Sequence, residues 1–326
     1  MRILRGHSRP TGPCALTIGS FDGVHRGHQA MLALLASEAR HRGLPPTVLT
    51  FEPHPRDFFA ALAARGGTPA RSPASAPPRI GTLRDKLAEL SRCGIAQVMV
   101  MRFDAALAAL SPQAFIDEVL CRRLGARYVL VGDDFRFGAR RAGDYTLLDA
   151  EGARRGFDVA RMQSYEVHGL RVSSSAVREA LAAGDMARAA DLLGRPYAIG
   201  GRVLHGRKLG RTLGFRTLNQ RFGHPRPAAM GIFVSQVRGL AAHPLPAVSS
   251  LGVGPAGEGA RRGQQEAPLL DWPAGLATDA GYGHCITVEL LHKLHDERPY
   301  PSLDALQAGI AADVQAARDW FAARRR

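Results

Sequence analysis

The sequence has no hydrophobic run long enough to cross a membrane, and its first residues, MRILRGHSRPTGPC, lack the apolar core of a secretory signal. These absences argue against membrane-spanning and exported proteins, so we expect a cytoplasmic protein without a membrane partner. Cysteine is also scarce, and the four cysteines are scattered without the spacing of a metal site: Cys14, Cys93, Cys121 and Cys285. We therefore expect isolated, reduced thiols.

Acidic residues are outnumbered, and the formal net charge is +14. A basic protein of this kind could bind nucleic acid. However, the arginines are spread along the chain in alanine-rich segments, and aromatic residues make up only 6% of the sequence. That pattern is equally typical of a GC-rich genome, and basic clefts also suit small anionic substrates. We expect small-molecule partners and no nucleic acid, and the sequence leaves self-association open.

A chain of 326 residues is long for one domain and natural for two. Its first half alternates short apolar runs with helical patterns, which predicts a doubly wound α/β domain around a parallel sheet. The strands are expected at 15–19, 47–51, 97–103 and 128–132. The helices are expected at 29–40, 82–93, 112–124 and 145–155. Residues 65–79, rich in proline, glycine and serine, predict a surface loop.

The character of the sequence changes near residue 187, where a short helix ends at Gly194 and Pro196. Beyond it come β-like pieces at 197–204, 232–237 and 286–291, separated by glycine- and proline-rich connections. We predict a small β-barrel closed by an amphipathic helix over 303–321. The expected domains are therefore 1–186 and 187–326.

The stretch GSFDGVHRGHQ places two histidines, His25 and His28, at the turn between a predicted strand and a predicted helix. The first turn of a helix carries unpaired N–H groups and a partial positive charge, so phosphate binds there readily. Gly19, Gly23 and Gly27 let the backbone approach a ligand closely. Imidazoles at this position can donate hydrogen bonds to phosphate oxygens that gain charge during attack on phosphorus. An ordinary turn that happens to carry two histidines is the alternative.

Two further stretches also follow predicted strands. TFEPHP holds His54 between prolines that stiffen its backbone, and VGDDFRFGARRAG carries Asp134 and Phe135 where ligands of α/β sheets bind. Phe135 or Phe137 could pack against a flat ring. The arginines of the second stretch could meet phosphate: Arg136, Arg140 and Arg141. Plain loops remain the alternative for both stretches.

The stretch RVSSSAVREAL contains a serine run at the start of a predicted helix. Ser173 and Ser174 are natural helix caps, which is the structural interpretation. In the functional interpretation, the hydroxyls of Ser174 and Ser175 meet phosphates, and Arg178, one turn further on, holds a departing phosphate group.

Together these motifs resemble the nucleotidylyltransferases with a His-x-Gly-His motif and, more closely, the prokaryotic bifunctional riboflavin kinase/FAD synthetase family. The resemblance extends over nearly the full chain. It implies a Rossmann-like nucleotidylyltransferase domain followed by a small β-barrel riboflavin kinase domain with a C-terminal helix. It also implies FAD biosynthesis, in which riboflavin is phosphorylated to FMN and FMN is adenylylated to FAD with release of pyrophosphate. ATP, Mg²⁺ and flavins are the expected ligands.

The resemblance implies roles for residues of the first half. The catalytic residues would be His25, His28 and Arg178. The ATP-binding residues would be Gly19, Phe21, Asp22, Gly27, Ser174 and Ser175. The flavin-binding residues would be His54, Asp134, Phe135 and Arg136. Ser175 stands where the family has threonine, so a hydroxyl is kept.

For the second half, the resemblance lies in HGRKLGRTLGFRTLN and QQEAPLLDW. It implies that Lys208 and Gly210 bind ATP, and that Thr217 and Asn219 hold Mg²⁺, which prefers oxygen ligands. Glu266 would accept the proton of the riboflavin 5′-hydroxyl.

This half departs from the family pattern at four positions: Arg216, Ala256, Pro268 and His295. Two hypotheses follow. In the first, which we favour, the kinase works despite these changes. In the second, the protein is an FAD synthetase only, and an impaired kinase-like domain serves flavin binding or regulation.

Two other functions are compatible with parts of the sequence. An enzyme that adenylylates nicotinamide mononucleotide or phosphopantetheine would share the histidine motif, but it would need neither the second domain nor GDDFRFG. A flavin- or RNA-binding regulator would fit the basic charge, but it would not need both the histidine pair and the Ser-Ser-Ser-x-x-Arg stretch.

Overall fold

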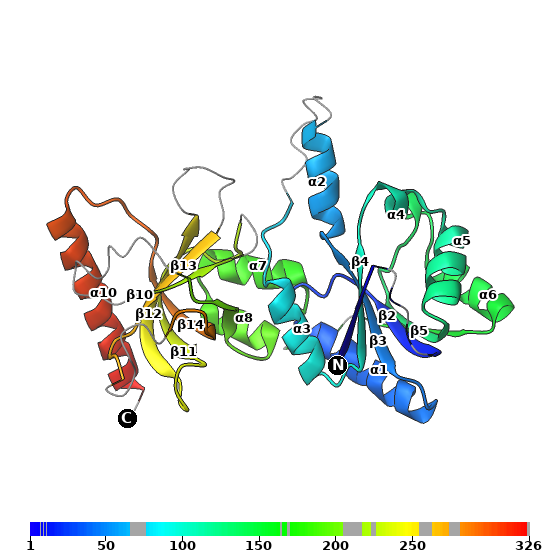
Figure 1. Cartoon of the computed structure of the whole chain (residues 1–326), viewed down its shortest axis with the longest axis horizontal. Helices are drawn as coiled ribbons and strands as arrows, with labels where there is room; N and C mark the ends of the chain where they lie inside the picture. The colour runs from blue at the N-terminus through cyan, green and yellow to red at the C-terminus, as the bar shows by residue number, and fades with distance from the viewer. Residues whose placement is uncertain are drawn as a thin grey trace. The chain divides into compact units, whose positions relative to one another are not determined.

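The computed structural model of the chain describes residues 1–6, 8, 10, 12–65, 76–163, 165–167, 170–204, 217–222, 226–253, 263–273 and 281–324 (Figure 1). The contacts between residues divide it into two compact units. The first contains Met1–Pro77 and Lys86–Val172, and the second contains Pro78–Asp85 and Ser173–Arg326. A short segment of the first half of the sequence, Pro78–Asp85, therefore belongs by its contacts to the second unit.

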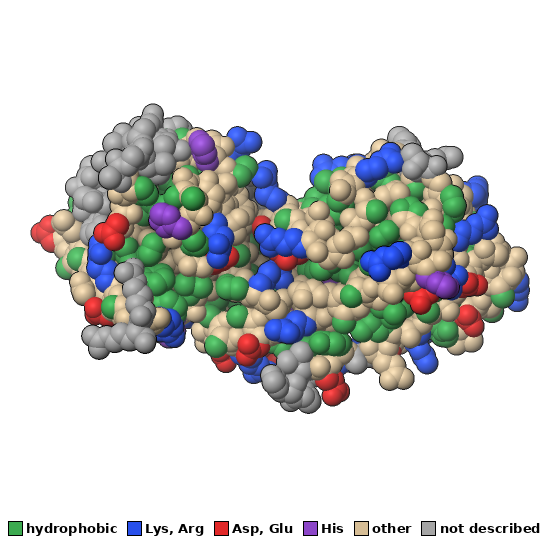
Figure 2. All heavy atoms as spheres, turned by 90° about the horizontal axis from the view of Figure 1, so that it is seen from below, with side chains coloured by type: hydrophobic (Ala, Val, Ile, Leu, Met, Phe, Trp, Pro, Cys, Tyr) green, Lys and Arg blue, Asp and Glu red, His purple; other side chains and the backbone are tan. Residues whose placement is uncertain are grey.

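The surface carries charge of both signs. On the face shown in Figure 2, lysine and arginine side chains are dispersed among acidic, apolar and neutral ones. Among the helices of the described residues, none has the length and apolar character needed to cross a membrane.

The first unit is built on a sheet of six parallel strands in the order β1-β4-β3-β2-β5-β6. The strands are β1 (Arg2–Arg5), β2 (Cys14–Ile18), β3 (Pro46–Glu52), β4 (Gln97–Arg102), β5 (Ala126–Gly132) and β6 (Asp158–Met162). The four inner strands confirm the prediction of a doubly wound parallel sheet. The edge strands β1 and β6 were not predicted, because charged side chains interrupt their short apolar patterns. A two-stranded hairpin, β7 (Glu166–Val167) and β8 (Leu170–Arg171), follows the sheet.

Helices alternate with these strands, as predicted. They are α1 (Arg26–His41), α2 (Pro55–Arg65), α3 (Leu83–Arg92), α4 (Ala105–Ala109), α5 (Pro112–Phe115), which continues as a π-helix (Ile116–Arg123), a 3₁₀ turn (Ala139–Arg141) and α6 (Tyr145–Arg155). The sequence did not predict α2, because the prolines of TFEPHP favoured a stiff loop. Proline is well tolerated in the first turn of a helix, and Pro55 is the first residue of α2.

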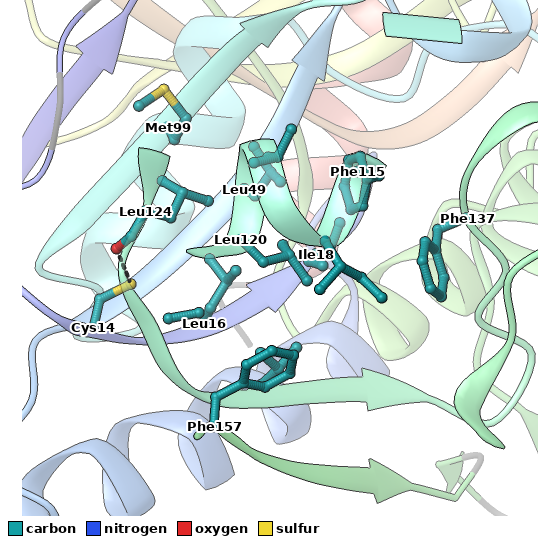
Figure 3. Close-up of a cluster of buried hydrophobic side chains, with 14 of the residues drawn as sticks. Cys14, Leu16, Ile18, Leu49, Met99, Phe115, Leu120, Leu124, Phe137 and Phe157 are labelled. Atoms are coloured by element: carbon teal, nitrogen blue, oxygen red, sulfur yellow. Dashed lines mark hydrogen bonds between the residues drawn. The ribbon is translucent and has the colours of Figure 1, made fainter. Parts of the chain in front are cut away.

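A large cluster of buried hydrophobic side chains in the first unit covers one face of the sheet (Figure 3). Leu16 and Leu49 of the sheet meet Phe115 and Leu120 of the helical layer, and all four are buried. The thiol of Cys14 donates a hydrogen bond to the Leu124 carbonyl at 3.3 Å, and burial raises the pKa of this thiol to about 11. Cys14 is therefore a neutral core thiol, in line with the expected reduced cysteines.

The second unit is an antiparallel barrel. Its sheet has the order β10-β13-β12-β11-β14-β9, and the amide of Leu204, just after β9, donates to the Asn219 carbonyl of β10 at 2.8 Å, which links the two edges. The elements are α7 (Ser174–Ala183), α8 (Met186–Leu193), β9 (Tyr197–Arg202), β10 (Thr217–Arg221), β11 (Gly231–Arg238), β12 (Leu245–Val253), β13 (Gly263–Pro268), β14 (Cys285–His295) and α10 (Leu303–Ala323). The predicted barrel and C-terminal helix are confirmed, and Ala317 of α10 packs against Val234 and Val248.

The segment Pro78–Asp85 is attached to the barrel by hydrogen bonds. Arg79 exchanges backbone hydrogen bonds with the chain around Pro227, where the Arg79 amide donates to the Arg226 carbonyl at 3.2 Å. One carboxylate oxygen of Asp85 accepts from the Gly200 amide at 2.9 Å, and the other accepts from the amide and hydroxyl of Thr82 at 2.9 and 2.7 Å. The prediction of a surface loop over 65–79 is wrong at its end, because Arg79 is buried; 66–75 lie outside the described residues.

We predict that Asp85→Ala lowers the free energy of unfolding by about 2 kcal/mol, because it removes the carboxylate that accepts from Thr82 at the start of α3 and from the Gly200 amide. Urea unfolding followed by circular dichroism measures the change. Asp149→Ala, which removes an exposed aspartate of α6, is the matched control. If the two variants unfold at the same urea concentration, the link between Asp85 and the barrel contributes nothing to stability.

Candidate active sites

Two of the predicted motifs lie at the switch point of the parallel sheet. From β2, the strand order runs through β3 and β4 on one side and through β5 and β6 on the other. Crevices of such sheets open beyond the carboxyl ends of the strands at this point. The turn after β2 carries His25 and His28, and the loop after β5 carries Asp134 and Phe135. The structure therefore gives both motifs the position expected of a ligand site.

The turn after β2 is held by its own side chains. Helix α1 begins at Arg26, three residues earlier than predicted, and His25 is its N-cap. The Nδ1 atom of His25 accepts a hydrogen bond from the His28 amide at 3.3 Å. Gln29 donates to the Val24 carbonyl at 2.8 Å. His28 therefore lies in the first helical turn, where backbone N–H groups are available to phosphate.

The two imidazole rings stack on each other. Their centroids are 3.6 Å apart with an angle of 19° between the ring planes, and the Phe21 ring lies 4.9 Å from that of His28. Phe21 and Val24 adopt positive φ angles of 47° and 42°, which non-glycine residues rarely do. Such strain costs about 1–3 kcal/mol per residue and gathers at functional sites. A Cβ on Gly27 would lie 3.3 Å from the His25 ring, so any other residue at this position would crowd the ring.

The electrostatic surroundings keep His28 neutral. Burial lowers the pKa of His28 well below its ordinary value, and electrostatic interactions with His25 and Lys86 lower it further. The Nδ1 atom of His28 is buried and has no hydrogen-bond partner among the described residues. A neutral imidazole keeps one N–H group to donate to a phosphate oxygen. No sequence motif pointed to Lys86, which is a buried residue of α3.

His54 lies between the end of β3 and the first residue of α2. It is buried, and its Nδ1 atom accepts a hydrogen bond from the Arg56 amide at 3.0 Å. The preceding bond, Glu52–Pro53, is cis. His54 therefore has a fixed orientation at the carboxyl end of β3, the neighbour of β2 in the sheet.

The loop after β5 separates the two phenylalanines that the sequence left as alternatives. Phe137 is buried in the core, with its ring 5.7 Å from that of Phe115, whereas Phe135 is only partly buried and stacks on Phe137 at 5.5 Å. Of the two, Phe135 has the surface for a flat ligand. Asp134 and Arg136 are exposed, and Arg136 pairs with Asp144 at 3.2 Å.

In the second unit, the serine run starts α7. Ser173 is the N-cap and accepts from the Ala176 amide at 3.2 Å, while Ser174 and Ser175 occupy the first turn. Arg178, one turn further on, donates to the Pro78 carbonyl at 2.8 Å. The two interpretations therefore apply to different serines. Ser173 caps the helix, and the hydroxyls of Ser174 and Ser175 lie at the helix N-terminus, where phosphate can bind.

Strand pairing brings the three expected kinase residues together. Thr217 and Asn219 are two residues apart on β10 and so share a face of the sheet. Glu266 of β13 lies directly opposite Asn219 in the register. The Asn219 amide nitrogen donates to Thr217 Oγ1 at 3.3 Å. Its Oδ1 atom is buried and has no hydrogen-bond partner among the described residues, which fits a ligand for a hard cation such as Mg²⁺.

Two departures from the family pattern are accommodated locally. Pro268 is the last residue of β13, so the N–H group that it lacks falls at the end of the strand. His295 ends β14, and its Nε2 atom lies 2.8 Å from Asp313 Oδ1 of α10. His295 therefore contributes to the attachment of the C-terminal helix. The remaining expected residues of this half lie outside the described residues: Lys208, Gly210, Arg216 and Ala256.

The chain matches two protein families in succession: FAD synthetase over residues 7–176 and riboflavin kinase over residues 193–321. It is also similar to curated proteins named bifunctional riboflavin kinase/FMN adenylyltransferase. The Escherichia coli (strain K12) protein is 44% identical over 325 residues, with 98% of each chain covered. The Pseudomonas fluorescens protein is 41% identical over 321 residues, covering 98% of this chain and 97% of the relative.

Among solved structures, one described as a macrolide-efflux protein from Streptococcus pneumoniae has a TM-score of 0.75, with 98% of this chain and 100% of that chain covered. Its sequence identity is 24%, so this likeness shows a shared fold alone.

We predict that NMR titration of His28 gives a midpoint well below the ordinary value of about 6.5. A histidine with a lowered pKa binds protons less readily in the folded than in the unfolded state. Its contribution to stability is therefore complete above about pH 6.5 and is lost as the pH falls below that value. The signal of His28 is identified by its absence from the spectrum of His28→Gln. A midpoint at or above 6.5 would contradict the neutral imidazole.

Proposed function

The chain belongs to the bifunctional riboflavin kinase/FMN adenylyltransferase family, and from this premise we propose how its residues carry the two reactions. The enzyme phosphorylates riboflavin to FMN with ATP and adenylylates FMN to FAD with release of pyrophosphate. One observation carries the assignment: a match to the FAD synthetase family and a match to the riboflavin kinase family follow one another along a single chain. An adenylyltransferase for another nucleotide would not have the second match.

We assign residues 1–186 to FMN adenylylation and residues 187–326 to riboflavin phosphorylation. In support, the first family match ends at residue 176 and the second begins at residue 193. Helix α7 begins at the end of the first match and α8 ends at the first residue of the second match, and by contacts both helices group with the barrel. These helices would thus join the stretch assigned to FMN adenylylation to the stretch assigned to riboflavin phosphorylation.

For adenylylation, we assign His25 and His28 to the α-phosphate of ATP. A phosphate oxygen of FMN attacks the α-phosphorus, and the bond from that phosphorus to the bridging oxygen of pyrophosphate breaks. The neutral His28 N–H donates to the oxygens that gain charge in the transition state. Ser174 and Ser175 would bind phosphates at the N-terminus of α7, and Arg178 would hold the departing pyrophosphate. Positioning and charge stabilisation are sufficient for such transfers.

The remaining residues of this site would position the two substrates. The nucleotide would contact the turn after β2 through Gly19, Phe21, Asp22 and Gly27. The flavin would lie against the ends of β3 and β5, at His54, Asp134, Phe135 and Arg136. Phe135 is only partly buried, which supports this assignment, since a flat aromatic ring system can stack on the part of its ring that stays exposed.

For phosphorylation, we assign Glu266 as the base that takes the proton of the riboflavin 5′-hydroxyl. The hydroxyl oxygen attacks the γ-phosphorus of ATP, and the bond from that phosphorus to the bridging oxygen breaks, so that ADP leaves. Thr217 and Asn219 would hold Mg²⁺, which would neutralise charge on the phosphates when bound. One observation supports them: the buried Oδ1 atom of Asn219 has no hydrogen-bond partner in the part of the chain that the structure describes. Lys208 and Gly210 are assigned to ATP by resemblance alone.

We further propose a cytoplasmic enzyme whose partners are its small-molecule substrates. Its dependence on ATP supports the compartment. The dispersed basic residues in Figure 2 favour anionic substrates over a nucleic-acid partner. Self-association stays open.

We predict that His28→Ala lowers FMN adenylylation about 10²–10³-fold, because a donor to the transition state is lost. Riboflavin phosphorylation should be nearly unchanged, since its residues lie in the barrel. FAD formed from FMN and FMN formed from riboflavin are measured separately. His41→Ala, at the exposed end of the same helix, is the control. Equal loss of both activities with the fold intact would refute the assignment of two sites.

We predict that Glu266→Gln lowers FMN formation about 10²–10⁴-fold, because the amide keeps the shape but cannot take the proton. FAD formation from supplied FMN should persist. Asp304→Asn, an exposed carboxylate of α10, is the control. Full kinase activity in Glu266→Gln would place the base on another residue.

The same assay on the wild-type protein distinguishes the two hypotheses for the barrel, a working riboflavin kinase and an impaired kinase-like domain. If it forms FAD from FMN but no FMN from riboflavin, the departures from the family pattern have disabled the barrel site. The double variant Arg216→Pro with His295→Arg should then restore phosphorylation.

A further inference from the structure

Lysine is rare in this protein, and one of its lysines is buried. The sequence has 40 arginines but only three lysines: Lys86, Lys208 and Lys293. Lys86 is only 4% exposed, although lysine is among the residues least often buried. Arginine serves almost everywhere else as the cation. Lysine at this position therefore indicates a need for a compact point charge in place of a planar guanidinium.

A chain of hydrogen bonds leads from Lys86 to the histidine turn. The Lys86 ammonium donates to Thr50 Oγ1 at 3.3 Å. The Thr50 hydroxyl donates in turn to the Ser20 carbonyl at 3.4 Å. Thr50 is fully buried on β3, and Ser20 lies directly after Gly19 in the turn that follows β2. Lys86 thus supports, through one intermediate side chain, the backbone that positions His25 and His28.

The charge of Lys86 also acts on His28. The groups that lower the pKa of His28 after burial are His25, on the same turn, and Lys86, on α3. Asp22, a buried carboxylate, belongs to the same turn. Since His28 stays neutral, it contributes a hydrogen-bond donor while a second group contributes the positive charge. Because the positive charge comes from a residue other than His28, binding of phosphate at this turn does not depend on protonation of His28.

We propose that Lys86 is a positioning residue for adenylyl transfer, which fixes the Ser20 carbonyl through Thr50 and places a positive charge beside the histidine pair. This role rests on the proposed FMN adenylylation at the same turn. It is distinct from the roles of the histidines, because Lys86 acts on the turn through the hydroxyl of Thr50.

The test compares Lys86→Met, which keeps the length of the side chain without its charge, with Lys86→Arg, which keeps a charge. The control is Lys293→Met, the same chemical change on β14. Three quantities are measured for each variant: the kcat of FAD formation from FMN, the kcat of riboflavin phosphorylation, and the NMR titration midpoint of His28.

In Lys86→Met we expect the kcat of FAD formation to fall about 10- to 100-fold, with riboflavin phosphorylation unchanged and the His28 midpoint moved upwards. Lys86→Arg should return the midpoint toward that of the wild type. Lys293→Met should leave FAD formation unchanged. An unchanged kcat in Lys86→Met would overturn the proposal, and so would a fall in kcat with an unmoved His28 midpoint, because the loss would then be structural only.

If Lys86→Met does not fold, the variant Thr50→Val tests the proposal instead. It keeps the shape of Thr50 and removes the hydroxyl between Lys86 and Ser20. A fall in FAD formation with phosphorylation intact supports the proposal, and an unchanged rate overturns it. A wild-type protein that makes no FAD would refute the proposed function instead. The His28 midpoint in Lys86→Met or Lys86→Arg would still test the effect of Lys86.

Discussion

The parallel arrangement of the strands is the constraint on which the first active site depends. Every strand of a parallel sheet delivers its carboxyl end to the same edge, so residues far apart in sequence meet where the strand order reverses. The turn after β2 and the loop after β5 are separated by more than one hundred residues, and the pairing of β2 with β5 makes them neighbours. The strained turn at Phe21 and Val24 and the stacked histidines are built on this edge.

In the barrel, the register of the antiparallel strands brings together the residues of the second proposed site. A one-residue slip between β10 and β13 would move Glu266 to the opposite face from Asn219. The position of the proposed base relative to the proposed cation ligands is thus set by backbone pairing, and the side chains need no long loops to meet. Both sites therefore take their geometry from sheets, which hold side chains more precisely than free loops do.

Much of this could be predicted from the sequence. The alternation of apolar runs and helical patterns indicated the inner strands, and the glycines around His25 and His28 indicated a candidate phosphate site. Other features have no local signal. Helix α2 was missed because Pro53 and Pro55 indicate a loop when considered alone, and the edge strands β1 and β6 are stabilised mainly by their neighbours. Lys86 carries no motif, since its role depends on the packing of α3 beside β3. Phe135 and Phe137 could be separated only by their burial.

The attachment of Pro78–Asp85 to the barrel has a consequence for synthesis on the ribosome. The residues that bind this segment include Gly200 and Arg226, more than one hundred positions later. The first unit is therefore interrupted by a peptide whose acceptors and donors have not yet been made when it emerges. A fragment that begins at residue 187 would lack this peptide, and a fragment that ends at residue 186 would carry it without its partners. The two catalytic functions can be assigned to separate stretches of sequence, but no single cut separates the two compact units.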